Sequence, residues 1–157
     1  MVELAYGPRA PRKWFKNTEG CALGQIHADI RVANRVDEAL VERGLANGHP
    51  VRLLDLEAVL VDTGATTLCL PKSQVAELGL PLKRRGHATT AAGDFWVNIY
   101  GDAQVYLLGR NVTVECVELE DGTNPLLGVE PLEFMGIEPD LRNQRLILLP
   151  DEEWLRV

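Results

Sequence analysis

Asp62, Thr63 and Gly64 are the residues of this sequence whose types and order could carry chemistry. They follow the apolar run Val59-Leu60-Val61, so a strand would end in a carboxylate with little water around it. Gly64 lets the chain bend without a Cβ, which brings backbone amides close to that carboxylate. A carboxylate held in this way is suited to acid–base chemistry. On its own, the tripeptide is more often a plain strand-to-turn junction in which Asp is the turn residue.

Two strands and a helix are expected before this motif. Residues 25–32 alternate strictly between apolar and polar, which is typical of a half-buried strand. The apolar face of this strand consists of Ile26, Ala28, Ile30 and Val32. Residues 51–61 also have period two and run directly into Asp62. Their expected apolar face consists of Leu54, Leu56, Ala58 and Leu60. Residues 37–43 between the two strands read as a short helix that ends before Gly44.

Short elements are expected after the motif as well. A strand over 67–70 leads into a helix over 71–78, with Gly79 as its C-cap. Residues 83–119 read as consecutive antiparallel strands. The turn residues that separate them lie at 92–94, 101–102 and 109–111.

The C-terminal third continues in the same style. Val112, Val114 and Cys116 alternate with polar neighbours, as in a strand. A polar loop over 120–125 precedes the apolar pair Leu126-Leu127 and Gly128. A helical turn over 131–135 and a last strand pair, near Ile137 and over 144–149, complete the chain. Because strands dominate and the helices are short, the fold class is all-β, a barrel or a sandwich.

Three parts of this pattern together resemble the retropepsin-like (retroviral-type, clan AA) aspartic proteases, and the small bacterial members in particular. The first is Leu60-Val61-Asp62-Thr63-Gly64-Ala65, the second is the hairpin tip Ala91-Ala92-Gly93-Asp94, and the third is Leu126-Leu127-Gly128 with the helix that follows. The resemblance covers about residues 24–150. It implies a closed barrel of antiparallel strands with short helices, one lobe per chain, paired as a homodimer.

The resemblance also implies a role for individual residues. Asp62 would be the catalytic aspartate of an endopeptidase. Thr63 would hold its loop against the twin loop of the second subunit, and Gly64 would let substrate approach closely. The hairpin at Ala92 and Gly93 would be a flap that closes over a peptide. The residues expected to contact substrate are Ala65, Thr66, Ala92 and Gly93.

Amide hydrolysis by carboxylates alone uses two of them. Hydrolysis needs a base for water and an acid for the leaving amine, and two neighbouring carboxylates that share one proton supply both. The sequence has one Asp-Thr-Gly and is too short for a two-lobed protease, while Asp121-Gly122-Thr123 has these residue types in another order. The second Asp62 is therefore expected from a second copy across a two-fold axis. No cofactor and no metal is expected.

The sequence departs from the retroviral pattern at two positions. Retroviral members carry an acid after the motif and an arginine after the later glycine, and these residues pair to brace the dimer. Thr66 and Val129 occupy those positions here, so this brace is absent. The insert over 34–51 is also longer than in viral enzymes.

A second interpretation, in which the protein is a binding module and not an enzyme, also stays open. The same fold could serve as a dimeric peptide-binding or scaffold module with little or no turnover. The other chemistry-bearing side chains suggest less: His27, His49 and His87 are dispersed and read as solvated surface, and Cys69 and Cys116 lie in apolar strands and read as inert core thiols. Phe95 and Trp96, next to the hairpin tip, could either cover substrate or pack the hairpin.

Composition limits the partners. The 157 residues are 46% hydrophobic and carry 23 acidic against 16 basic residues, a net charge of −7. This charge argues against a nucleic-acid partner. Residues 1–23 read as a loose basic leader and 24–157 as the protease domain. No stretch approaches the ~18 apolar residues of a membrane span, so a cytoplasmic protein without a membrane partner is expected.

Overall fold

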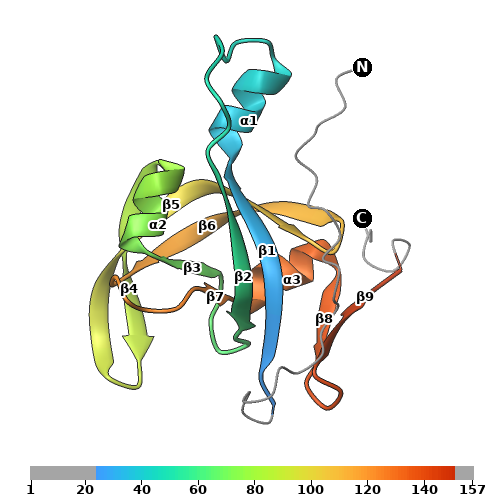
Figure 1. Cartoon of the computed structure of the whole chain (residues 1–157). Helices are drawn as coiled ribbons and strands as arrows, with labels where there is room; N and C mark the ends of the chain where they lie inside the picture. The colour runs from blue at the N-terminus through green and yellow to red at the C-terminus, as the bar shows by residue number, and fades with distance from the viewer. Residues whose placement is uncertain (1–23, 151–157) are drawn as a thin grey trace.

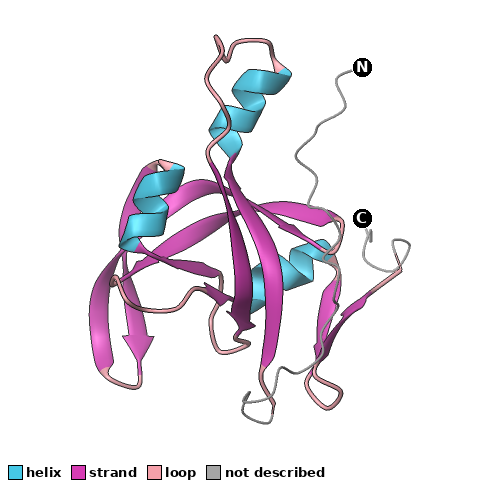
Figure 2. Ribbon diagram, in the orientation of Figure 1, coloured by secondary structure: helices cyan, strands magenta, loops and turns pink. Residues whose placement is uncertain are grey.

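The computed structural model describes residues 24–150, so the expected leader lies outside the described residues. Strands make up most of this part of the chain, and three short helices lie between them (Figures 1 and 2). The strands are β1 (Ile26–Asn34), β2 (Leu53–Val61), β3 (Leu68–Pro71), β4 (Leu82–Thr90), β5 (Gly93–Leu107), β6 (Arg110–Leu119), β7 (Leu126–Leu127), β8 (Ile137–Asp140) and β9 (Arg145–Leu148). The helices are α1 (Arg35–Glu42), α2 (Lys72–Leu78) and α3 (Val129–Met135). The mostly-β expectation is confirmed.

The main sheet forms a ring. Its strand order is β1-β2-β7-β3-β6-β5-β4, and β1 also pairs with β5, which returns the order to its start. β4 stands outside this ring and, among the described strands, pairs with β5 alone. The expectation of purely antiparallel strands is wrong, because β2 pairs with β7 and β3 with β6 in parallel. The chain skips one position of the sheet between β2 and β3 and another between β6 and β7. β7 therefore lies between β2 and β3.

β1 confirms the alternation expected from its sequence. All four residues of its apolar face are at most 3% exposed: Ile26, Ala28, Ile30 and Val32. These side chains pack with residues from β2, β3, β5 and β6 and with Leu132 and Met135 of α3. The core therefore fills the inside of the ring, and α3 closes one side of it.

β2 does not keep the expected face along its whole length. Leu54 and Leu56 pack against the core, but Ala58 is exposed, and Val59 and Val61 are the buried residues nearer the motif. A β-bulge causes the change, because the pairing with β1 slips by one residue between Ala28 and Ile30. The prediction that Ala58 and Leu60 continue the apolar face was wrong.

A second bulge replaces an expected turn. Gly101 and Asp102 do not separate two strands but lie inside the 15-residue strand β5. Asp102 has a φ of +58°, and the pairing with β6 shifts between Tyr100 and Ala103. The expected turns at the β4–β5 and β5–β6 connections are present.

Local signals explain where the helices begin and end. α1 starts two residues before the expected 37–43, because Asn34 caps it by accepting a hydrogen bond from the Asp37 N–H at 3.1 Å. Gly79 and Gly136 end α2 and α3 in the left-handed conformation, with φ of +61° and +64°. Within residues 24–150, no helix is long and apolar enough to cross a membrane.

Candidate active site

Asp62 directly follows β2, and backbone groups hold it in place. Its N–H donates to the Leu127 carbonyl oxygen of β7 at 3.0 Å. Its Oδ1 accepts a hydrogen bond from the Gly64 N–H at 2.8 Å. The side chain is half-buried, so the carboxylate keeps access to solvent. The expected strand that ends in a carboxylate close to backbone amides is therefore present.

Gly64 has little room beside this carboxylate. A Cβ on Gly64 would come 3.1 Å from Oδ1 of Asp62, which is closer than most real Cβ contacts. The Ala65 N–H donates to the Asp62 carbonyl oxygen at 3.0 Å and closes a tight turn. Glycine at position 64 therefore leaves room for the Asp62 carboxylate beside the turn that follows it.

The segment Leu126–Glu130 fastens the loop from the other side. Its backbone amides donate to three successive carbonyl oxygens of the loop, at 2.9–3.0 Å: Val129 to Ala65, Glu130 to Thr66 and Gly128 to Thr67. The parallel pairing of β7 with β2 continues this contact to Val61. Two motifs more than sixty residues apart in the chain thus form one hydrogen-bonded unit.

The threonines of the loop differ in their surroundings. Thr63 and Thr66 are exposed, whereas Thr67 is buried and its Oγ1 donates to the Glu115 carbonyl oxygen of β6 at 2.8 Å. Sequence reasoning had placed Thr67 only as the first residue of a strand. A polar residue at the start of an otherwise apolar strand was the available signal. Thr67 links the loop to a third strand of the ring.

The Cys69 thiol is close enough to Asp62 to feel its charge. Burial and the negative charge of Asp62 raise the pKa of this thiol to about 11. Burial also raises the pKa of the Cys116 thiol on β6. Both thiols are free and buried, and at neutral pH they stay protonated. The interpretation of these cysteines as inert core thiols agrees with this environment.

The β4–β5 hairpin carries at its tip the residues that were expected in a flap. Thr90 pairs with Gly93, so Ala91 and Ala92 form the turn, and Gly93 has a φ of +123°. In Figure 1 the tip of this hairpin and the loop after β2 both extend toward the lower part of the molecule.

Trp96 packs within the hairpin but remains largely open. Its ring lies edge-on to His87 of β4, with ring centroids 4.3 Å apart, and the Arg85 guanidinium lies 5.7 Å from its centroid. Trp96 is nevertheless 63% exposed, and Phe95 is 48% exposed. His87 is exposed, as expected, and also contacts Trp96.

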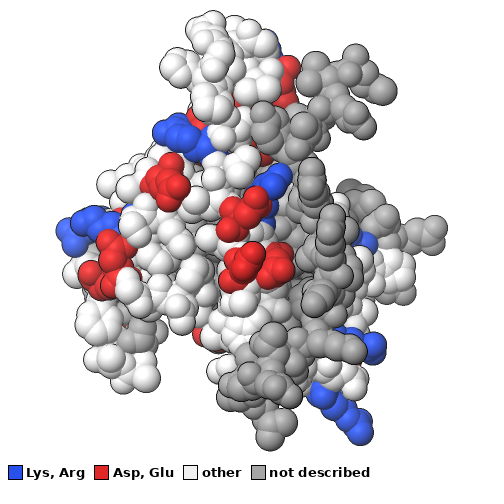
Figure 3. Space-filling model, viewed as in Figure 1, with Lys and Arg blue, Asp and Glu red and all other residues white. Residues whose placement is uncertain are grey.

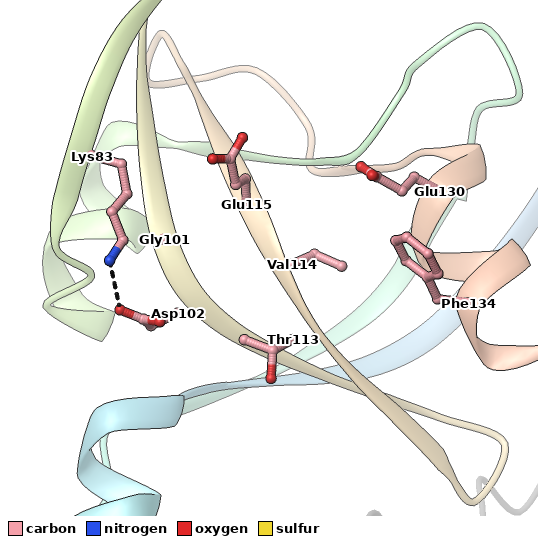
Figure 4. A pocket seen from close by; sticks show the side chains of 8 residues that line it. All are labelled: Lys83, Gly101, Asp102, Thr113, Val114, Glu115, Glu130 and Phe134. Atoms are coloured by element: carbon pink, nitrogen blue, oxygen red, sulfur yellow. Dashed lines mark ion pairs between the residues drawn. The ribbon is translucent and has the colours of Figure 1, made fainter.

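An open pocket of about 320 Å³ lies apart from Asp62 (Figure 4). Residues of β4, β5, β6 and α3 line it, including Phe134 and the ion pair of Lys83 with Asp102, whose atoms are 3.3 Å apart. None of the residues proposed for the site from sequence contributes to its wall. In the part of the chain that the structure describes, no three His, Cys, Asp or Glu residues gather as metal ligands would.

Comparison with known proteins agrees with this architecture. The family model described as "gag-polyprotein putative aspartyl protease" matches residues 43–133. The match includes Asp62, the β4–β5 hairpin and the segment Leu126–Gly128. No curated protein matches the chain. Because the matched region is more than half of the 157 residues, the chain belongs to this family of retropepsin-like aspartyl proteases.

Proposed function

We propose that this protein is an aspartic endopeptidase that cleaves peptide bonds with a pair of Asp62 carboxylates, one from each subunit of a homodimer. The observation that carries the proposal is the fixed, half-buried Asp62 carboxylate, which directly follows β2 in a loop hydrogen-bonded to Leu126–Glu130. Membership in an aspartyl protease family supports peptide hydrolysis as the reaction.

The need for a second copy follows from the chemistry. Within residues 24–150, no other carboxylate is hydrogen-bonded to Asp62. A single carboxylate cannot be the ionised base for water and a protonated acid at the same time. Two Asp62 side chains close to one axis share a proton, because both cannot ionise at that distance. The ionised member then accepts the proton of the attacking water, and the protonated member supplies one to the amide nitrogen.

The exposed part of the loop suits the remaining roles. Thr63 is exposed beside Asp62, so its hydroxyl can bond to the backbone of the twin loop. Gly64 presents backbone without a side chain, and Ala65 and Thr66 follow it toward a bound peptide. Because Thr66 and Val129 cannot form the retroviral ion pair, the dimer requires other contacts.

The β4–β5 hairpin is proposed as the flap. Its small tip residues Ala91 and Ala92 are exposed and would let a peptide lie against the backbone. Gly93 gives the tip a conformation that side chains with a Cβ rarely adopt. In this proposal the tip closes over substrate and reduces the water around the two carboxylates.

The test is hydrolysis of a broad peptide library between pH 3 and pH 8 by the wild type and by Asp62→Asn. The Asn variant keeps the side-chain shape and should fold normally but lose activity by several orders of magnitude, because no acid–base pair remains. Asp121→Asn is the matched control, since Asp121-Gly122-Thr123 holds the same residue types outside the site. It should retain activity.

Two outcomes contradict the proposal in different ways. Cleavage that survives in Asp62→Asn would assign the activity to another mechanism or to a contaminating protease. A dimer that binds peptides while neither form cleaves them would favour the peptide-binding module.

A further inference from the structure

The direction of the Asp62 side chain depends on how many residues precede it in β2. Directly paired residues of antiparallel strands lie on the same face of the sheet. Leu54 pairs with Val32 and Leu56 pairs with Ile30, and both β1 residues are buried. Leu54 and Leu56 therefore face the core.

The buried residues of β2 change from even-numbered to odd-numbered positions before the strand ends. Val59 pairs with Ala28 and Val61 pairs with Ile26, so these residues also face the core. Two residues, instead of one, separate Leu56 from Val59. Strict alternation from Leu56 would have pointed residue 62 into the core, where a carboxylate loses its water. The extra residue turns Asp62 away from the core.

The extra residue is held by a side chain of the neighbouring strand. Ala58 has a φ of +50°, a conformation that residues with a Cβ rarely adopt. Its N–H donates to Oδ1 of Asp29 at 2.9 Å. Asp29 lies between Ala28 and Ile30, where the pairing slips. The carboxylate thus accepts the hydrogen bond of the residue that the bulge displaces.

We infer that Asp29 is a positioning residue for Asp62: its carboxylate holds the Ala58 bulge, and the bulge sets the face on which Asp62 emerges. The inference rests on the proposed function only for its effect on catalysis. Asp29 is exposed on the outer side of β1, and acidic side chains are visible on the face that β1 and β2 present in Figure 3. Asp29 is thus an acid on that outer face with a specific hydrogen-bonding task.

Three variants distinguish the hydrogen bond that Asp29 accepts from the negative charge that it carries. Asp29→Ala removes the acceptor and leaves Ala58 in its left-handed conformation without that bond. Asp29→Asn keeps an oxygen that can accept from the Ala58 N–H while it removes the charge. Asp29→Ala combined with Ala58→Gly relieves the backbone conformation that the acceptor stabilised, since glycine adopts positive φ readily.

Asp55→Ala is the matched control on the same pair of strands. Asp55 is also an exposed acid, and it accepts hydrogen bonds from Arg31 at 2.6 Å and 2.9 Å. Its substitution removes a cross-strand bond of the same sheet but leaves the bulge intact. Any general loss of stability from cutting such a bond appears in this control.

The experiment measures kcat and KM for peptide cleavage, together with amide hydrogen exchange at Ala58 and Asp62. Asp29→Ala should lower kcat roughly 10- to 100-fold with little change in KM, because the reacting group is displaced. Exchange at both amides should become faster. Asp29→Asn and the double variant should recover most of the loss, and Asp55→Ala should retain its kcat.

Wild-type kcat and unchanged exchange in Asp29→Ala would overturn the inference. Equal losses of kcat in Asp29→Ala and Asp55→Ala would also overturn it. If the wild type cleaves no peptide, the proposed function fails by itself, and the exchange rates at Ala58 and Asp62 still decide whether Asp29 holds the bulge.

Discussion

Gly128 lies so close to Ala65 that a Cβ on Gly128 would come 2.6 Å from the Ala65 carbonyl oxygen. The same Cβ would come equally close to backbone atoms of Thr66 and Thr67. Backbone atoms cannot swing aside as a flexible side chain can. The hydrogen bonds between the loop and Leu126–Glu130 therefore require glycine at this position.

Gly128→Ala should push the loop away from β7. We expect a loss of about 1–3 kcal/mol in the free energy of unfolding, since the added methyl has no space. Peptide cleavage should fall with it, because Asp62 moves with its loop. Urea denaturation and peptide hydrolysis measure the two effects. Gly101→Ala is the control, as its Cβ would meet only the Lys83 side chain, which can move. Equal stability of the two variants would contradict the expectation.

β9 is the surface expected to contact the second subunit of the proposed dimer. Ile147 and Leu148 are 37% and 45% exposed, and neighbouring strand residues point to opposite faces, so both faces of β9 are partly open. Ile147→Glu should raise the dissociation constant of that dimer roughly 100-fold, because it places a charge in an apolar contact. Sedimentation velocity at micromolar concentration measures this. Removing β9 and the residues after it is a poorer test of the dimer. Such a truncation also removes the buried Leu146 and the Leu149 carbonyl to which Arg110 donates.

Leu45→Glu controls for the added charge, since Leu45 is 59% exposed in the loop after α1. It should leave the dimer unchanged. A wild-type chain that sediments as a monomer at this concentration would remove the basis of the paired Asp62 carboxylates.

Gly93→Val tests the flap. A β-branched residue disfavours the φ of +123° at this position, so the hairpin tip should change shape. We expect kcat/KM to fall at least about tenfold while the melting temperature changes by no more than a few degrees, since the turn residues 91 and 92 are exposed. Gly109→Val makes the same change in the β5–β6 turn, where φ is +78°. Similar activity losses in both variants would mean that the β4–β5 tip has no special role.

Asp37 anchors the base of α1 in a pH-dependent way. The Arg52 guanidinium, hydrogen-bonded at 2.7 Å and 2.8 Å, holds the pKa of this carboxyl below its ordinary value of 3.8. A carboxyl whose pKa is lower in the folded state stabilises the fold above the unfolded pKa. This contribution is lost as the pH falls through the folded value.

Asp37→Asn should therefore destabilise the protein by about 1 kcal/mol at pH 7 and by less below pH ~3.8. Urea denaturation at pH 7, 5 and 3 measures the difference from the wild type. Glu77→Gln, on the exposed side of α2, should give a small difference at every pH. A difference for Asp37→Asn that grows toward pH 3 would contradict the assignment.

Local patterns in the sequence predicted much of this fold. The alternation in β1, the glycine cap of α2 and the strand that ends at Asp62 depend on neighbouring residues, and all are present. The two bulges were not predictable, because Ala58 and Asp102 are ordinary strand or turn residues whose positive φ comes from contacts with other strands. The parallel pairing of β7 with β2 was also hidden, since a two-residue strand has no periodicity of its own.

Some residues of the candidate site could likewise be identified from the sequence, and others could not. Asp62 and Gly64 could be identified from their order, and Leu126–Gly128 from its composition and its resemblance to a known pattern. Thr67 and Asp29 could not be identified, because a buried threonine and an exposed acid become informative only when the strand opposite is known.

β5 is supported unequally along its length. Residues 103–106 pair with β1 on one side and β6 on the other, whereas residues 93–98 pair with β4 alone among the described strands. In mechanical terms the hairpin is anchored in the ring at one end and projects from it toward the other. Beyond the side-chain bonds of Arg84 to Glu115 and of Asn98 to Glu118 on β6, β4 and the outer half of β5 are joined by their own pairing. The half of β5 in the ring therefore belongs to the same sheet as β2, which Asp62 follows, whereas the outer half carries the tip that is proposed to close over substrate.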